Sequence, residues 1–305
     1  MAENHNENEA MNQGDDISGI VSRVGSNVFE YKPGDRVAAF HRMFTPHGSY
    51  AEYAIAPAST TFLLPPNIPF EAGATLPLAT MTAALALYQN LKLPLPWQPA
   101  KEDIPVLIYG GASAVGAYAL QYAKLSGLHP IITVAGNGID FVASLDAASH
   151  IIDYRKGNVV QDVLTALEGK PLQFAFDAIS YNRSYENIVN IFKSSGGGHI
   201  DMVDPPKYDD RNPDRDSWTW PEGVTFTRTF VSSAYGKAHS YRNEKQAAED
   251  KEFAYVFYRY ISRLLSQDRF KPHPFEVLPG GLESVGDGVQ KLYNRSVSSK
   301  KLVYR

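Results

Sequence analysis

The sequence predicts an α/β protein in which a parallel, doubly wound sheet follows a smaller β-rich region. From residue 106 onward, short apolar runs alternate with helical periodicity, at the spacing of strand–helix–strand units. Between residues 17 and 57, short alternating segments are instead separated by Gly and Pro, without a long helical period. A proline-rich connector over 92–103 divides the two patterns, so we expect a domain boundary near residue 100.

In the first part, we expect short strands over 17–25, 36–40 and 48–57, followed by a helix that is most regular over 80–91. In the second part, the expected strands are 106–109, 130–136, 150–154, 173–180 and 199–203. The expected helices are 115–125, 138–147, 159–169, 185–197 and the long amphipathic segment 244–267. Residues 204–223 are expected to form a solvated loop, and 273–305 to return as strand, helix and strand.

Composition restricts the classes of function. The net charge of −4 gives no basic excess to neutralise phosphates, which argues against a nucleic-acid partner. Cysteine is absent from the 305 residues, which removes disulfides, thiolate zinc ligands and a cysteine nucleophile. No apolar run approaches the ~18 residues that a membrane span needs. Residues 1–16 are polar and have no signal core, so we expect a disordered lead-in and a cytoplasmic protein.

A glycine-bearing turn joins the strand over 106–109 to the following helix. In dinucleotide-binding folds, the first glycine permits the tight bend, the second lets the backbone approach the pyrophosphate, and the third allows close helix–strand packing. Gly110, Ser113 and Gly116 occupy these positions. The Ser113 hydroxyl adds a donor, whereas its Cβ makes the closest approach harder. The context favours a dinucleotide site, and a purely structural turn is the alternative.

The end of the next strand indicates which dinucleotide binds. A NAD site shows Asp or Glu ~20 residues past the motif. The residues there are Ala135, Gly136 and Asn137. Asp140 falls in the next helix, so a 2′-phosphate is not repelled, and Asn137 can donate to it. Tyr154 follows the third strand on the same edge with Arg155 and Lys156, for which a surface role is an equal alternative. We predict NADP(H) over NAD(H).

Taken together, these segments resemble the medium-chain dehydrogenase/reductase superfamily. The stretch from Gly14 to Phe40 is similar to its motif G-x-D-x-x-G-x-V-x-x-V-G…G-D-R-V, and the resemblance covers roughly residues 14–305. The segments that continue it in order are 47–57, 74–88, 106–127 and 301–305. The branch it resembles most is the zinc-independent quinone-oxidoreductase-like group, and within it the fungal stand-alone enoyl reductases that serve polyketide synthases.

The resemblance implies a GroES-like catalytic domain over 17–100, a Rossmann NADP-binding domain over 101–268 and a return to the first domain over 269–305. It further implies hydride transfer from NADPH to the activated C=C of a small-molecule or carrier-bound enoyl or quinone-like substrate, in secondary-metabolite biosynthesis. A polyketide synthase is the implied partner, and the protein is a monomer or a homodimer. The implied site residues are Thr82 near the nicotinamide and, for the cofactor, Gly110, Gly111, Ala112, Ser113, Ala114, Val115, Gly116, Asn137, Tyr154, Ser180, Tyr235, Gly236 and Lys301.

Two departures from the family pattern bear on catalysis. Zinc-binding members use cysteines, so no metal site is expected here. The family's first strands, with a lysine or tyrosine that orients substrate or donates a proton, are replaced by residues 1–16. We therefore expect a GroES-like domain that is incomplete on one side. The remaining candidate donors are Thr82, the cofactor ribose, His41 and His47, with a loop role as the alternative for each histidine.

Two other readings of function stay open. A degenerate member without turnover would act as a binding or scaffolding partner, or the pocket would catalyse a non-redox cyclisation. No G-x-S-x-G elbow, Walker loop or HExxH motif is present, so hydrolase and nucleoside-triphosphatase functions are unsupported.

Overall fold

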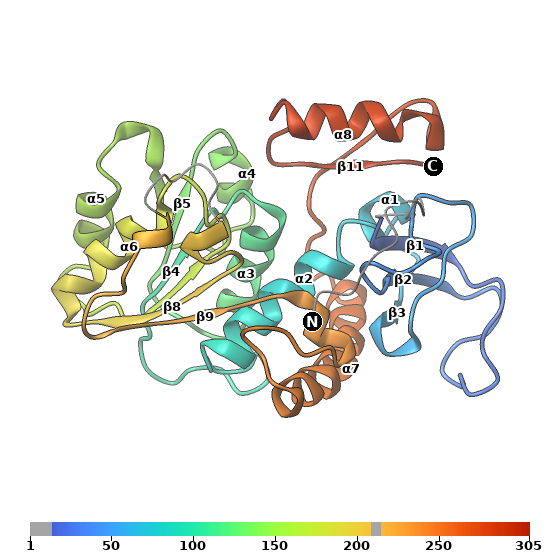
Figure 1. Ribbon diagram of the computed structural model, residues 1–305, viewed down its shortest axis with the longest axis horizontal. Helices are drawn as coiled ribbons and strands as arrows, with labels where there is room; N and C mark the ends of the chain where they lie inside the picture. The colour runs from blue at the N-terminus through green and yellow to red at the C-terminus, as the bar shows by residue number, and fades with distance from the viewer. Residues whose placement is uncertain (1–13, 209–214) are drawn as a thin grey trace.

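The computed structural model describes residues 14–208 and 215–305. An α/β unit and a smaller β-rich unit lie side by side, with two helices, α2 (Pro77–Ala84) and α7 (Glu244–Ser266), between them (Figure 1). Most of the predicted lead-in, residues 1–13, lies outside the described residues. Its last residue, Asp16, already begins strand β1 (Asp16–Ile20).

The α/β unit is built on a parallel sheet of six strands in the order β6-β5-β4-β7-β8-β9. The strands are β4 (Val106–Tyr109), β5 (Ile131–Ala135), β6 (His150–Asp153), β7 (Phe174–Asp177), β8 (Gly198–Met202) and β9 (Val224–Arg228). The chain starts at the centre, runs out to one edge, and then returns to build the other half. The order therefore reverses between β4 and β7, where ligands bind beyond the carboxyl ends of the strands in such sheets.

Helices cover both faces of this sheet and bury its strands. The helices that follow the strands are α3 (Ala114–Leu125), α4 (Ile139–Ser144), α5 (Val159–Ala166) and α6 (Ser184–Phe192). Within β4, Val106 and Ile108 face the core that includes α3, whereas Leu107 packs into a second core with residues of α5 and α6. Burial on both faces explains why β4 reads as a continuous apolar run rather than an alternating one. The predicted doubly wound α/β fold is confirmed.

The smaller unit holds two separate sheets. In the first, β1 pairs antiparallel with β2 (Arg36–Phe40), which pairs antiparallel with β3 (Thr61–Leu63). In the second, β10 (Phe275–Val277) pairs in parallel with β11 (Lys301–Val303), and α8 (Val285–Tyr293) connects them. This agrees with the strand, helix and strand expected for the tail. Figure 1 shows α8 and β11 above the rest of the unit.

The strand expected over 48–57 does not form. The described chain there consists of bends and segments without regular structure, and Tyr53 and Ile55 expose 75% and 62% of their surface. Alternation of apolar and polar residues is stable as a strand only when a neighbouring strand and a buried face are available. Neither is provided for this segment among the described residues.

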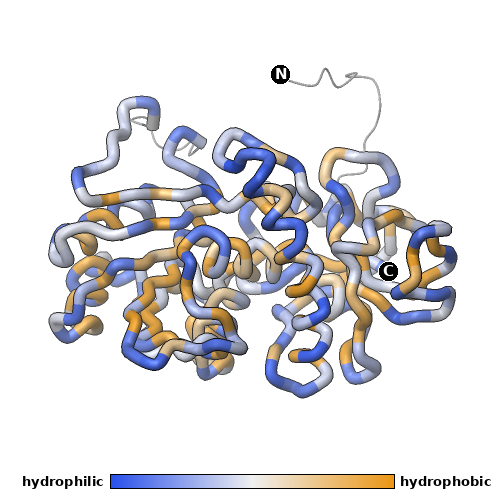
Figure 2. The backbone as a smooth tube through the Cα atoms, turned by 90° about the horizontal axis from the view of Figure 1, so that it is seen from below, coloured by the Kyte–Doolittle hydropathy of each residue, from blue (hydrophilic) through white to orange (hydrophobic). Residues whose placement is uncertain are grey.

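One apolar helical stretch extends beyond the residues 80–91 expected to be most regular. The helical run Phe70–Asn90, made of α1 (Phe70–Gly73), α2 and the π-helix η2 (Leu85–Asn90), is long and apolar enough to cross a membrane. However, 78% of its most apolar window is buried inside the protein, which is also the behaviour of a core helix. In Figure 2, hydrophilic residues (blue) gather instead at loops and outer turns.

Helix α7 connects the two units. It begins with a capping box, in which Asn243 and Gln246 satisfy each other's backbone N–H groups. Tyr258 of α7 stacks on Phe62 of β3, with ring centroids 5.6 Å apart, and its hydroxyl donates to the carbonyl of Pro77 at 3.0 Å. The same side chain therefore contacts the small sheet and the first turn of α2.

A buried polar network joins the sheet to α7. Its centre is Asp201 in β8, which is fully buried. The donors to the Asp201 carboxylate are Thr227 Oγ1 at 2.7 Å, Thr229 Oγ1 at 2.6 Å and Asn90 Nδ2 at 2.8 Å. Asn90 Oδ1 in turn accepts from Arg242 at 2.8 Å, and Arg242 forms a buried ion pair with Asp250 of α7.

We expect Asp201 to make stability depend on pH. Burial raises the pKa of Asp201 to about 7 from its ordinary 3.8. Between these values the unfolded chain has lost a proton that the folded chain keeps, so the free energy of unfolding falls as the pH rises from 4 to 7. The full decrease attributable to this residue is roughly 4 kcal/mol. Urea unfolding at several pH values should show this decline in the parent and its loss in Asp201→Asn; equal declines in both would contradict the prediction.

Candidate functional site

A cleft of about 830 Å³ opens at the carboxyl end of the parallel sheet, where the strand order reverses. Five of the predicted site residues line it: Gly110, Ala112, Ser113, Asn137 and Tyr154. Its volume lies in the range of pockets that hold cofactors and small ligands. The fold therefore brings together predicted site residues from the glycine turn, from the segment after β5 and from the segment after β6.

Backbone geometry requires glycine at Gly110 and Gly116 in the turn after β4. Gly110 has a φ of +90°, and the N–H groups of Gly110 and Gly111 both donate to the carbonyl of Val134, at 2.9 and 3.0 Å. A Cβ on Gly116 would lie 2.8 Å from the carbonyl carbon of Gly110 and closer still to its oxygen. Gly110 is needed for its backbone conformation, whereas Gly116 is needed because helix α3 packs directly on the turn.

Ser113 is the N-cap residue of α3. Its φ of −72° and ψ of 158° are extended, so this position does not need glycine for its conformation. Its Oγ accepts from the N–H of Gly116 at 3.0 Å and donates to the carbonyl of Gly110 at 2.8 Å. Because no preceding turn can accept from the first N–H groups of a helix, those of Ala114 and Val115 are suited to an anion. Binding of a cofactor pyrophosphate at these N–H groups stays a prediction.

We expect Ser113→Ala to lower stability more than it lowers cofactor affinity. The substitution removes the cap, which costs about 1 kcal/mol in comparable helices. The hydroxyl is used within the turn, so NADPH affinity should change little. Urea unfolding and fluorescence titration with NADPH, performed on the same preparation, measure the two effects separately. A large loss of affinity without a loss of stability would show that the hydroxyl contacts the cofactor.

The residues predicted to meet the 2′-phosphate lie together at one end of the cleft. Asn137 is exposed just after β5, and Tyr154 follows β6. A Cβ on Gly136 would lie 2.8 Å from the Tyr154 hydroxyl oxygen, so the tyrosine packs directly against this glycine. Lys156 and Asp140 are exposed nearby in sequence, and neither lines the cleft.

Ser180 lies next to the cleft but does not line it. It is fully buried with a φ of +56°, its N–H donates to Asp177 Oδ1 at 2.8 Å, and its Oγ accepts from the N–H of Asp204 at 3.2 Å. The lining residues at this strand end are its neighbours Ile179 and Tyr181. The described geometry gives Ser180 a role in fixing the ends of β7 and β8.

Tyr235 and Gly236 lie between the two units. The Tyr235 hydroxyl accepts from the N–H of Met43 at 3.1 Å, and its ring stacks on Phe40 of β2 with centroids 5.5 Å apart. Burial raises the pKa of Tyr235 to about 12, so the side chain keeps its proton at neutral pH. Gly236 has a φ of +84° and ends the 3₁₀ turn that carries Tyr235. This segment therefore contacts both the end of β2 and the loop that follows it in the smaller unit.

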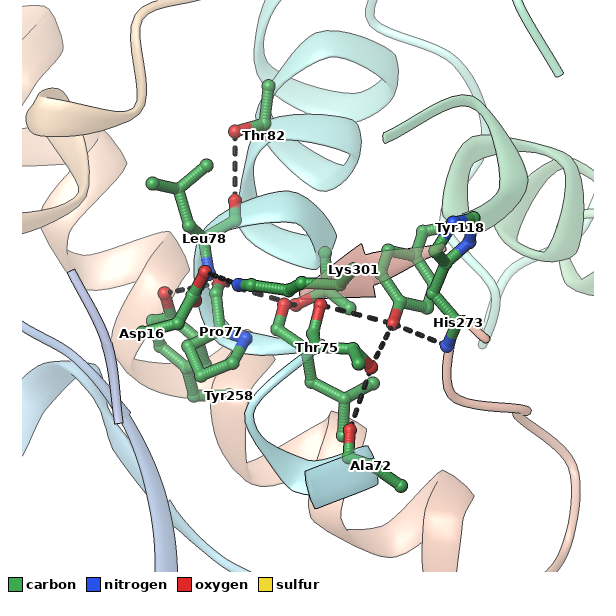
Figure 3. A network of polar contacts seen from close by, with 12 residues as sticks. Asp16, Ala72, Thr75, Pro77, Leu78, Thr82, Tyr118, Tyr258, His273 and Lys301 are labelled. Atoms are coloured by element: carbon green, nitrogen blue, oxygen red, sulfur yellow. Dashed lines mark hydrogen bonds and ion pairs between the residues drawn. The ribbon is translucent and has the colours of Figure 1, made fainter. Parts of the chain in front are cut away.

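Thr82 and Lys301 belong to a polar network around α2 rather than to the cleft lining (Figure 3). The Thr82 hydroxyl donates to the carbonyl of Leu78 at 2.8 Å. Lys301, at the start of β11, forms an ion pair with Asp16, whose other oxygen accepts from the N–H of Leu78 at 2.7 Å. Lys301 thus fastens the end of the chain to β1 and α2.

The two candidate histidines help to shape the loop after β2. His41 is buried, with Nδ1 2.5 Å from the carbonyl oxygen of Ile55 and Nε2 3.1 Å from that of Thr45. His47 is exposed with a φ of +69°, and its carbonyl accepts from the N–H of Ile55 at 3.0 Å. These contacts match the loop role that was the alternative for each.

Other lining residues were not singled out from the sequence. They are Tyr109, Asn158, Gln161, Asn182, Asn187, Val297, Ser298 and Ser299, among others. Asn158 and Gln161 follow the third strand, so their position in the sequence could have indicated that they lie near the cleft. Residues 297–299 come from the loop before β11, far away in sequence, and no local pattern indicates that they reach the cleft. Among the described residues, no group of three or more His, Asp or Glu is placed to hold a metal ion.

Known sequences indicate the family to which this fold and glycine turn belong. The alcohol dehydrogenase GroES-like domain matches residues 2–66. A trans-enoyl reductase of Gibberella fujikuroi is 41% identical over 278 residues, which are 88% of this chain and 76% of that protein. A trans-enoyl reductase of Fusarium heterosporum is 32% identical over 308 residues, covering 95% of this chain and 82% of the relative.

Solved structures share the fold at lower identity. The quinone oxidoreductase of Pseudomonas syringae superposes with a TM-score of 0.68 at 21% identity, over 96% of this chain and 82% of that one. The quinone oxidoreductase of Escherichia coli, solved with NADPH, gives a TM-score of 0.68 at 20% identity, over 95% and 81%. With the sequence relatives, the fold and the glycine turn in agreement, the chain belongs to the trans-enoyl reductases of the medium-chain dehydrogenase/reductase superfamily.

Proposed function

We propose that this protein is a zinc-independent reductase that uses NADPH to reduce the C=C bond of an α,β-unsaturated carbonyl compound. The observation that carries the proposal is the cleft at the reversal of strand order, with an anion cradle at the start of α3, in a chain of the trans-enoyl reductase family. The quinone oxidoreductase of Escherichia coli, which shares the fold, was solved in complex with NADPH, which supports the choice of cofactor.

Different residues of the cleft would bind different parts of the cofactor. The turn from Gly110 to Gly116 would hold the pyrophosphate through backbone N–H groups. Asn137 and Tyr154 would meet the 2′-phosphate with neutral donors. When bound, the cofactor supplies the hydride, and the protein supplies position and an environment from which water is excluded.

Two buried hydroxyl groups, those of Thr82 and Tyr235, are candidates for hydrogen bonds with the substrate. The Thr82 proton is donated to Leu78, so its oxygen remains available as an acceptor. The Tyr235 oxygen accepts from Met43, and its own proton is retained at neutral pH, so it is suited to donate to a developing enolate oxygen. In this proposal, Thr82 helps to position the bound groups as an acceptor, and Tyr235 is the donor to the substrate.

The substrate class follows from the family. We propose an enoyl thioester or a related small enone, supplied free or on a carrier, with a polyketide synthase as the partner. The protein would act in the cytoplasm as a monomer or a homodimer.

The test is NADPH consumption by the purified protein with a short enoyl thioester, an enone and a quinone. We expect loss of NADPH absorbance with at least one of the first two and formation of the saturated product. NADPH binding without turnover on any of them would favour a non-catalytic scaffold. Absence of NADPH binding would overturn the proposal at its first step.

A further inference from the structure

An ion pair stands beside the end of the cleft that is proposed to take the 2′-phosphate. Arg155 Nε donates to Asp153 Oδ1 at 2.8 Å, and Arg155 Nη2 donates to Asp153 Oδ2 at 2.7 Å. This two-point geometry uses the planar fork of the guanidinium fully and is the strongest form of such a pair. Asp153 Oδ1 also accepts from the backbone N–H of Arg155 at 3.1 Å, which fixes the carboxylate at the end of β6.

The same arginine orients a residue of the cleft. Arg155 Nη1 donates to Asn137 Oδ1 at 2.7 Å. An amide whose oxygen faces Arg155 has only its NH₂ group left for a ligand. Asn137 lines the cleft, whereas Arg155 and Asp153 lie outside its lining. The group that meets the ligand is therefore a neutral donor, and the positive charge stands behind it.

The charge of Arg155 is already balanced. Its pairing with Arg155 lowers the pKa of Asp153 to about 2, so the carboxylate is ionised at neutral pH. Asp153 has only 15% of its side chain exposed, against 48% for Arg155. A phosphate approaching this edge meets a pair with no net charge, and the next residue in the chain, Lys156, is exposed.

Resting on the proposed NADPH site, we propose that Asp153 limits the preference of this protein for NADPH over NADH by holding Arg155 in a closed ion pair behind Asn137. Asp153 is a positioning residue, because it acts on the cofactor through Arg155 and Asn137. Neutral hydrogen bonds from Asn137 and Tyr154 read the 2′-phosphate, and the guanidinium takes no direct part.

The test compares the dissociation constants of NADPH and NADH in five proteins by cofactor fluorescence. Asp153→Asn keeps an oxygen for the backbone N–H of Arg155 but removes the charge, so it should release the guanidinium. We expect its preference for NADPH to rise about tenfold or more, with NADH binding unchanged. Arg155→Ala in the parent should change the preference by less than about threefold, and in the Asp153→Asn background it should cancel the gain. Asp140→Asn, at an exposed carboxylate of α4 on the same edge, is the matched control and should have no effect.

Each outcome has a distinct meaning. If the parent binds NADPH and Asp153→Asn leaves the preference unchanged, the inference is overturned and the proposed function stands. If Arg155→Ala alone weakens NADPH binding tenfold or more, Arg155 already contributes to phosphate binding, directly or through Asn137, and the inference is again overturned. If the parent binds neither dinucleotide, the proposed function fails and the inference fails with it. The salt dependence of NADPH binding gives a second readout, and it should steepen in Asp153→Asn.

Discussion

Replacing Gly116 with alanine is expected to weaken NADPH binding at least 100-fold, which corresponds to about 2.7 kcal/mol. The added Cβ would lie 2.8 Å from the carbonyl carbon of Gly110 and 3.0 Å from the Cα of Gly111. These neighbours are backbone atoms of a turn that is itself tied to β5, so they cannot move aside as a flexible side chain would. The helix must shift away from the turn, and the N–H groups that form the phosphate cradle shift with it. Fluorescence titration with NADPH measures the loss.

The control for this variant is Gly286→Ala. Gly286 lies in helix α8, and a Cβ added there meets nothing within 4 Å. This substitution should leave NADPH affinity unchanged and, as an alanine in a helix, should not lower stability. Urea unfolding of Gly116→Ala separates loss of the cradle from loss of the fold. A Gly116→Ala protein that binds NADPH as the parent does would show that the cofactor is held elsewhere.

Removing Asp250 is expected to cost about 3–5 kcal/mol of stability, the largest effect that we predict on folding. Its carboxylate receives both Nε, at 2.7 Å, and Nη2 of Arg242, and the side chains of Arg242 and Asp250 are only 10% and 2% exposed. In Asp250→Ala the guanidinium stays buried without its counter-charge. Because Arg242 also donates to Asn90, the loss should spread toward Asp201. Urea denaturation at neutral pH measures it directly.

A surface pair serves as the matched comparison. Lys124 and Asp146 lie 2.8 Å apart with side chains 52% and 94% exposed, so Asp146→Asn should cost much less stability than Asp250→Ala. Asparagine is used because Asp146 has a φ of +50°, a conformation that asparagine tolerates better than alanine does. A second variant tests the cause: replacing Arg242 and Asp250 together by apolar residues of similar size should recover most of the loss, because no unpaired charge remains. Equal losses in the buried and exposed single variants would contradict this account.

The sequence was most informative where a pattern is local. The continuous apolar run of β4, the capped α3 after it and the long α7 all follow from periodicity and end signals within a few residues. Strand β9 was missed: it follows the charged, proline-bearing segment 204–223, and its residues, Val-Thr-Phe-Thr-Arg, alternate as an edge strand does. Its pairing with β8 depends on a partner distant in sequence, which periodicity cannot supply.

The same limit applies to the site. Gly110 and Gly116 were assigned from the turn motif, because backbone requirements there are encoded locally. The contacts of Lys301 with Asp16 and of Arg155 with Asn137 join residues whose proximity only the folded chain establishes. Resemblance to a family placed Lys301 and Asn137 near the cofactor, but it did not indicate which charges are already paired.

The position of α7 has a consequence for how the protein loses its structure. One face of this helix packs on β3 and another on α2, and Tyr258 contacts both. The two units therefore share a structural element that neither can release without exposing its own core. We expect them to open as one cooperative unit, with amide protons of β2 and β4 exchanging through the same global event. Hydrogen exchange that is much faster in the small sheet would instead identify it as an independent subdomain.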